Sequence, residues 1–159
     1  MATHQQHIAL IITQILALSD DTLTAFSRGN PFDKLLRSYD EFTADGKGLY
    51  RKKLGSSHYR YSKSAYSSSL SADKLFGEHR IPLKLISQQL MNSDRKLSTV
   101  ESILSSNEVV LITDEEERRI NASKVNSGFA LRSVMAPNGG CRLAYCGIEI
   151  APETLPNHL

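Results

Sequence analysis

The residues best suited to chemistry in this sequence are an adjacent glutamate and histidine, Glu78 and His79. Hydrolysis of a phosphodiester needs a base that takes a proton from water near neutral pH, and the unperturbed histidine pKa of about 6.5 suits that task. The pair predicts His79 as a general base, with Glu78 binding a divalent ion or steering the imidazole. The alternative is structural: His79 hydrogen-bonds a neighbouring carbonyl, and Glu78 pairs with Arg80 or with a lysine.

A second set of candidate ligands lies further along the chain, in an acidic stretch at residues 114–117 and at Asn121. Mg²⁺ or Mn²⁺ would take oxygen ligands from Glu116, Glu117 or Asn121, and the last two are four residues apart on one helical face. The same acids also have a purely structural explanation. Thr113 suits a helix N-cap, Glu116 then stands at N3, and the helix dipole favours acids in the first turn. Asn121 is equally well explained as a solvent-facing helical residue.

The formal net charge of +2 hides a strongly basic segment, residues 47–63, which contains six basic residues and no acid. Basic side chains neutralise phosphates and aromatic rings stack on bases, so this composition favours a nucleic-acid surface, with DNA preferred as partner. The alternative is a solvated β-hairpin with inward tyrosines. Arg80 could hold a scissile phosphate. The candidate nucleic-acid-binding residues are Lys47, Arg51, Lys52, Lys53, His58, Arg60, Lys63 and Arg80.

The order of these parts resembles the His-Me finger, or HNH, nucleases. Their acid-His-x-x-Pro opening is matched by residues 78–82, Glu-His-Arg-Ile-Pro, and their later Asn-x-apolar strand-helix step is loosely matched by residues 107–113. The resemblance covers about a third of the chain. It implies a β-hairpin that presents the histidine as general base and a following helix that supplies metal ligands. The chain departs from the family in its long excursion between the two halves and in lacking a zinc-binding cysteine quartet.

Two functions from different classes follow from these features. The first is a small metal-dependent nuclease for DNA or RNA, of a defence or toxin type, acting alone or with a protein inhibitor. The second is a non-catalytic protein that binds nucleic acid, or a regulatory protein that docks on a larger defence or antidefence complex. The basic segment fits both classes, and only Glu78, His79 and the acidic stretch distinguish them.

The chain has 159 residues, 40% apolar and 23% charged, which predicts a single compact domain. The longest apolar run, residues 8–12, is too short to cross a bilayer and lacks the features of a signal peptide, so we expect a cytoplasmic protein without membrane partners. Two cysteines, Cys141 and Cys146, make neither a disulfide framework nor a zinc site. We interpret them as core or strand residues; a disulfide between them is conceivable in an exported chain.

Periodicity and capping signals predict an α+β fold with N-terminal helices, a central basic hairpin or loop, and short strands packed on helices. Its parts are a helical region 1–46, a basic and serine-rich arm 47–72, a catalytic part 73–126, and a C-terminal strand and tail 127–159. The expected helices are 5–26 with a pause at 19–21, 32–42, 83–92, 98–105 opened by a Ser98–Glu101 capping box, and 114–125. The expected strands are 50–61, 76–79, 109–112 and 141–150, with 62–71 as loop or weak helix.

Overall fold

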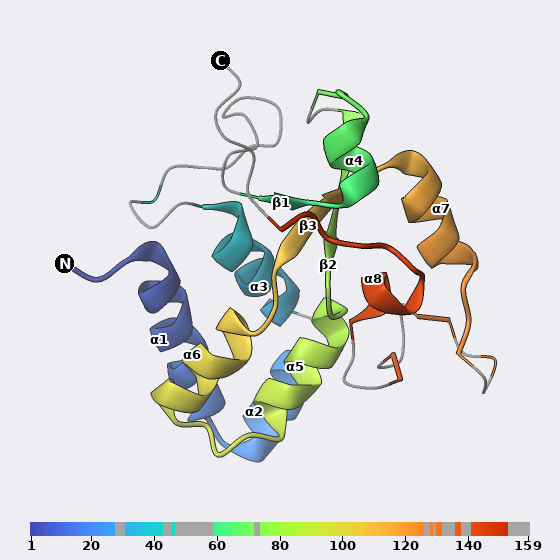
Figure 1. The fold of residues 1–159 in the computed structure, drawn as a ribbon. Helices are drawn as coiled ribbons and strands as arrows, with labels where there is room; N and C mark the ends of the chain where they lie inside the picture. The colour runs from blue at the N-terminus through green and yellow to red at the C-terminus, as the bar shows by residue number, and fades with distance from the viewer. Residues whose placement is uncertain are drawn as a thin grey trace. The chain divides into compact units, whose positions relative to one another are not determined.

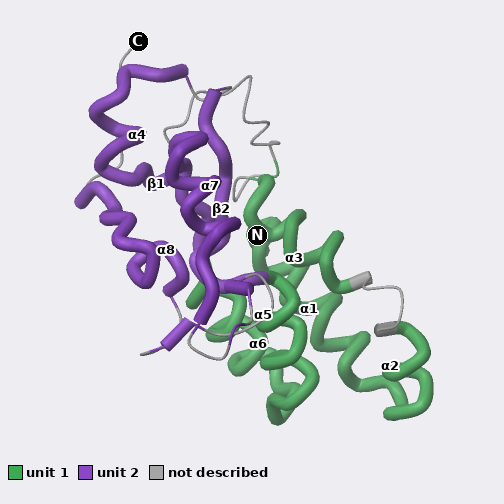
Figure 2. Tube along the Cα trace, turned by 90° about the vertical axis from the view of Figure 1, so that its right-hand side faces the viewer, with its two compact units in different colours: residues 1–48, 83–107 green, residues 49–82, 108–159 purple. Residues whose placement is uncertain are grey.

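The computed structural model describes residues 1–27, 31–42, 46, 59–71, 74–125, 128, 130–131, 136–137 and 141–152. Within these residues the chain forms eight helices and one three-stranded mixed sheet, which confirms the predicted α+β class (Figure 1). The chain divides into two compact units (Figure 2). Unit 1 joins residues 1–48 to 83–107, and unit 2 joins 49–82 to 108–159. Residues 83–107, which separate Glu78 and His79 from the acidic stretch in the sequence, are therefore part of the same unit as the N-terminal helices.

Unit 1 is helical. Its elements are α1 (His4–Leu16), α2 (Asp20–Ser27), α3 (Pro31–Glu41), α5 (Leu83–Met91) and α6 (Leu97–Ser105). Helix α1 starts at a capping box between Thr3 and Gln6 and buries a stripe at three- and four-residue spacing that includes Ile8, Ile12 and Leu16. The predicted break in the helix is present, but it lies at residues 17–19 and not at 19–21, because α2 begins at Asp20. The Ser19 hydroxyl accepts from the Thr22 amide at 3.4 Å. Helix α1 packs on α3 and α6, so its apolar stripe forms much of the core of unit 1.

The predicted Ser98–Glu101 capping box is wrong. Helix α6 begins one residue earlier, with Lys96 as its N-cap and no side-chain cap bond. The Asp94 carboxylate accepts from the Lys96 amide at 3.1 Å, and Arg95 adopts a left-handed conformation with φ 61°, which together set the turn into the helix. Ser98 is already within the helix, so its backbone is helical and not extended as an N-cap residue requires. Glu101 is therefore left without its expected role.

Unit 2 contains the sheet, in the order β1-β3-β2. Strands β2 (Phe76–His79) and β3 (Val109–Ile112) are antiparallel, and β1 (Arg60–Tyr61) is parallel to β3. The predicted strands 76–79 and 109–112 are thus confirmed, and β1 covers the last two residues of the predicted strand 50–61, whose residues 50–58 lie outside the described residues. In the serine-rich stretch Ser62 caps the short helix α4 (Lys63–Ser67), its hydroxyl accepting from the Ala65 amide at 3.0 Å. After β3, the predicted capping box of Thr113 and Glu116 opens α7 (Asp114–Ala122), which ends three residues before the predicted boundary.

Two clusters of buried side chains lie on opposite faces of this sheet, because successive side chains of a strand alternate between faces. Val110 and Ile112 pack with Ile120 of α7, and with Leu143 and Ile148; we name this side the α7 face. Leu111 lies between them in β3 and packs with Tyr61 and Ala65 of α4; we name that side the α4 face. Each face of the sheet thus has a buried cluster of its own.

The predicted strand at 141–150 is wrong. This stretch contains the short helix α8 (Arg142–Tyr145), followed by a turn at Gly147 with φ 68°, a conformation that glycine adopts without strain. Only Ile150 makes a β-bridge, with Ser62. Leu143 and Ile148 enter the α7-face cluster from a helix and a turn, so their apolar character does not need strand alternation. Cys141 and Cys146 are free thiols that pack against this cluster, which supports their interpretation as core residues but not as strand residues.

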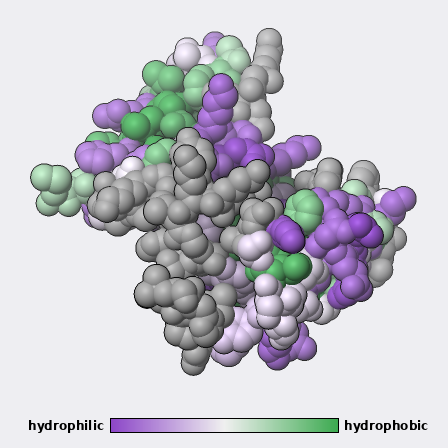
Figure 3. Space-filling model, turned by 90° about the horizontal axis from the view of Figure 1, so that it is seen from above, coloured by the Kyte–Doolittle hydropathy of each residue, from purple (hydrophilic) through white to green (hydrophobic). Residues whose placement is uncertain are grey.

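Some large hydrophobic side chains remain exposed, among them Leu10, Ile11 and Leu18 in unit 1, and Tyr66, Leu70 and Phe76 in unit 2. Figure 3 shows one face of the molecule, on which hydrophobic atoms lie among hydrophilic ones. Throughout the described residues, every helix is too short or too polar to cross a bilayer.

Candidate functional site

Glu78 and His79 are neighbours at the end of β2, but their side chains lie on opposite faces of the sheet. Glu78 is opposite Val110 in the β2–β3 register, and Val110 belongs to the α7-face cluster. His79 is opposite Val109, one residue along, so alternation puts its half-buried side chain on the α4 face. The acid and the histidine therefore face different surroundings.

The Glu78 carboxylate forms an ion pair with the guanidinium of Arg142 in α8. The Arg142 side chain is 9% exposed and that of Glu78 is 19% exposed, so the pair is largely withdrawn from water. Arg142 also donates from Nε to the His79 carbonyl at 2.8 Å and from its backbone amide to the Arg80 carbonyl at 3.2 Å. The pair and these two hydrogen bonds hold α8 against the end of β2.

Glu116 is 3% exposed and has a similar internal role. One of its carboxylate oxygens, Oε2, accepts from the Thr113 amide at 3.0 Å and from the Ser62 hydroxyl at 2.6 Å. The first bond completes the capping box of α7, and the second ties α7 to the residue that caps α4. Neighbouring α7 positions are less enclosed, since Glu117 is half-buried and Asn121 is exposed.

The donor set predicted for Mg²⁺ or Mn²⁺ does not fit such an ion as it stands. A divalent ion needs carboxylate oxygens that are turned toward it, whereas the Glu78 and Glu116 carboxylates are bound to Arg142 and to Ser62 and Thr113. Helix α7 lies on the face of the sheet opposite His79. Within the described parts of the chain, no three His, Cys, Asp or Glu side chains are grouped as metal ligands.

Three of the predicted nucleic-acid-binding residues are engaged in ion pairs within unit 2. One Glu108 oxygen accepts from Arg80 Nη1 at 3.0 Å and from Arg60 Nη1 at 3.3 Å, and Arg60 Nη2 donates to the Ala151 carbonyl at 3.1 Å. A side-chain hydrogen bond with Cys141, together with the pairing to Glu108, raises the pKa of the Arg80 guanidinium. Lys63 pairs with Glu149 and holds the pKa of that carboxyl below its usual value.

The structure does not describe the other predicted nucleic-acid-binding residues, which are Lys47, Arg51, Lys52, Lys53 and His58.

Arg142 and Glu108 were not identified from the sequence as the ion-pair partners of Glu78, Arg60 and Arg80. A signal for Arg142 was present, because it is a single charge beside Leu143 and Ala144 in an otherwise apolar stretch. An arginine in such a place usually has a carboxylate partner, since unpaired buried charges are costly.

No family model matches this chain, and neither the curated proteins nor the solved structures contain a match to it. The resemblance to HNH nucleases therefore stays a prediction that rests on the residues alone.

Proposed function

We propose that this protein binds nucleic acid through its basic segment, residues 47–63, and does not cleave it. The observation that carries the non-catalytic part is the ion pair between Glu78 and Arg142. A carboxylate held by a 9% exposed guanidinium serves the packing of α8 on β2. Glu116 is held in a comparable way by Ser62 and Thr113, so the two acids best placed for metal chemistry have structural partners.

The nucleic-acid part of the proposal rests on the charge pattern. Arg60 and Lys63 each have an acidic partner, which leaves phosphate binding to Lys47, Arg51, Lys52 and Lys53 within an acid-free segment. Each phosphate that a lysine or arginine neutralises releases counterions, so such binding weakens steeply with salt. Tyr50 lies between Lys47 and Arg51 in sequence and supplies a ring that stacks on bases, whereas the Tyr59 ring packs against the α4-face cluster.

A metal-dependent nuclease is the second candidate, and one observation favours it. Strands β2 and β3 are antiparallel, His79 ends β2, and α7 follows β3 directly, which is the strand-strand-helix order that the HNH resemblance implies. The two candidates differ in what they predict for His79. A general base contributes about 10²- to 10⁴-fold to the rate of hydrolysis, whereas a structural histidine contributes to stability alone.

The test is to incubate the protein with plasmid DNA and with RNA in Mg²⁺, Mn²⁺ or EDTA, and to measure binding and melting temperature on the same samples. We expect binding in all three conditions and no metal-dependent cleavage. His79→Ala should bind as wild type does, with a lower melting temperature. The control is His7→Ala, which removes an exposed histidine from α1. Metal-dependent cleavage that falls about 10²-fold in His79→Ala, at unchanged melting temperature, would overturn the proposal in favour of the nuclease.

A further inference from the structure

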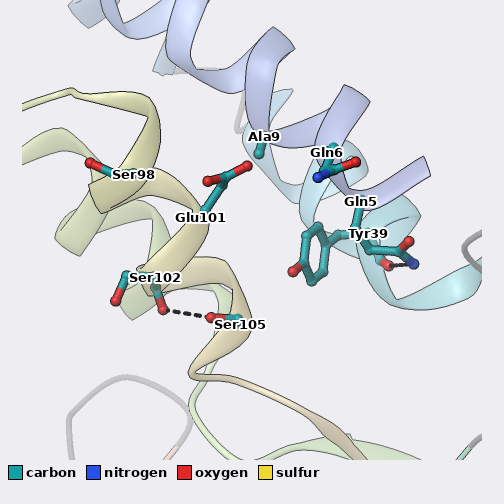
Figure 4. A pocket seen from close by; sticks show the side chains of 8 residues that line it. All are labelled: Gln5, Gln6, Ala9, Tyr39, Ser98, Glu101, Ser102 and Ser105. Carbon is teal, nitrogen blue, oxygen red and sulfur yellow. Dashed lines mark hydrogen bonds between the residues drawn. The ribbon is translucent and has the colours of Figure 1, made fainter. Parts of the chain in front are cut away.

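Unit 1 contains a pocket of about 430 Å³ between helices α1, α3 and α6 (Figure 4). This volume lies at the lower end of the range of small-molecule sites. Its wall combines apolar surface with polar side chains: Gln5, Gln6 and Ala9 come from α1, Tyr39 from α3, and Ser98, Glu101, Ser102 and Ser105 from α6. In Figure 4 the Glu101 side chain extends from α6 toward α1.

Glu101 is the charged group of this wall, and it has no structural partner among the described residues. The capping box that its sequence position suggests does not form, because α6 is capped at Lys96 without a side-chain bond. Glu101 makes neither a hydrogen bond nor an ion pair with any residue that the structure describes, although it is half-buried. A half-buried carboxylate without an internal donor favours a cation beside it.

The neighbouring groups define what kind of cation fits. The Gln5 amide already donates to the carbonyls of Tyr39 at 3.2 Å and Phe42 at 2.8 Å, so its two donor hydrogens are used and its oxygen is left to accept. The hydroxyls of Tyr39 and Ser102 can also accept. Burial, then Asp40 and Glu101, raise the pKa of the Tyr39 phenol, which keeps that group neutral beside the carboxylate. The pocket therefore offers one negative charge and several acceptors.

We propose that this pocket binds a guanidinium group, with Glu101 as its counter-ion and the Gln5 amide oxygen and the Tyr39 and Ser102 hydroxyls as acceptors. A guanidinium carries five N–H donors and no acceptor, which complements a wall of carboxylate, amide and hydroxyl oxygens. An ammonium presents three donors on a compact point charge and uses fewer of these acceptors, so we expect it to bind more weakly. The ligand is an arginine side chain of a protein partner or a free guanidino compound.

The experiment is a titration of the full chain, followed by amide shifts in ¹⁵N–¹H spectra, with N-acetyl-arginine amide and with the matched citrulline compound. Citrulline keeps the shape of arginine but replaces the charged guanidinium by a neutral urea. We expect saturable shifts in α1 and α6 with the arginine compound, and at least tenfold weaker binding of the citrulline compound, because hydrogen bonds to charged groups are the stronger ones. Free arginine binding more tightly than the amide would identify a small guanidino compound as the ligand; equal binding would identify an arginine side chain.

Two variants and one control locate the site. Glu101→Gln should weaken binding at least tenfold, and Tyr39→Phe should weaken it a few-fold, because a charged contact contributes more than a neutral one. Asp21→Asn removes the same charge from an exposed position on α2 and should leave binding unchanged. Equal binding of the citrulline compound, wild-type affinity in Glu101→Gln, or shifts that do not saturate would overturn the proposal.

Discussion

Unit 2 holds its two most enclosed candidate carboxylates, Glu78 and Glu116, against donors, whereas the Glu101 carboxylate of unit 1 lines a pocket with no such donor among the described residues. From the sequence, Glu78 is a candidate for catalysis, Glu116 is either a metal ligand or an N3 helix-start residue, and Glu101 has the spacing of a helix start. The difference lies in partners that are distant along the chain. Arg142 is 64 positions from Glu78, and Ser62 is 54 positions from Glu116.

The comparison teaches that residue type and spacing define what a carboxylate can do, whereas its tertiary partners decide what it does. A buried acid that is fully hydrogen-bonded costs little to keep, but removal of its partner exposes the full penalty of an unpaired charge. The two units should therefore respond differently to substitution. Changes at the paired acids of unit 2 should affect stability, and a change at Glu101 should affect ligand binding.

The largest effect should follow from Arg142→Ala. This substitution leaves Glu78 without its counter-ion and the His79 carbonyl without its 2.8 Å donor, on the largely buried side of the sheet. We expect the free energy of unfolding, measured by urea denaturation, to fall by about 3 kcal/mol.

The matched control is Arg118→Ala, which removes an arginine from a pair with Asp114 whose side chains are 76% and 51% exposed. Exposed pairs contribute about 0–1 kcal/mol, so this variant should be close to wild type. If Arg142→Ala were tolerated as well as Arg118→Ala, the Glu78 carboxylate would be free for another role and the comparison between the units would fail.

A smaller loss of stability is expected for Glu116→Ala. The substitution removes the capping box of α7 and the acceptor of the buried Ser62 hydroxyl. The two effects together should cost about 2 kcal/mol in the same denaturation experiment. Glu115→Ala, at a neighbouring α7 position whose side chain is 87% exposed, is the control and should change stability by less than about 0.5 kcal/mol. Unchanged stability together with loss of a metal-dependent cleavage would instead mark Glu116 as a metal ligand.

The smallest effect concerns the exposed pair of Lys63 and Glu149. Lys63 depresses the pKa of Glu149, so the pair favours the folded state at neutral pH, and this contribution is lost as the pH falls through the Glu149 pKa. In Lys63→Ala the pKa of Glu149 should rise toward its usual value, as followed by the side-chain carboxyl signal in an NMR pH titration. Lys96→Ala, which removes the partner of Asp94, is the control and should leave Glu149 unchanged. If the pKa of Glu149 did not change in Lys63→Ala, the Lys63–Glu149 pair would not form in solution and Lys63 would be available to bind a phosphate.

Local signals in the sequence predicted much of the fold. The Thr113–Glu116 capping box, the apolar spacing of α1 and the short apolar run of β3 each act within a few residues, and all three are confirmed. The two errors arose where tertiary packing overrides a local pattern. Residues 141–150 were predicted as a strand, but Leu143 and Ile148 reach the core from a helix and a turn. Ser98 was predicted as a cap, but α6 begins before it.

The arrangement of the candidate site was not predictable from spacing. His79 and Glu78 are adjacent in sequence, and adjacency in a strand sends their side chains to opposite faces. That consequence was available once Phe76–His79 was recognised as a strand. The identity of the face that α7 covers was not available, because it depends on Ile120 packing with residues from β3 and α8.

The most direct test of the account measures how binding to a fluorescently labelled DNA duplex, followed by anisotropy, depends on salt concentration. We expect the logarithm of the binding constant to fall linearly with the logarithm of salt concentration in the wild-type protein. The triple variant Arg51→Ala, Lys52→Ala, Lys53→Ala should flatten this slope by about two to three units. A control with the same change of charge, Lys34→Ala, Lys84→Ala, Lys124→Ala, at exposed lysines elsewhere, should keep the wild-type slope. Absence of binding at low salt, or the same slope in both triple variants, would contradict the proposal that the basic segment binds nucleic acid.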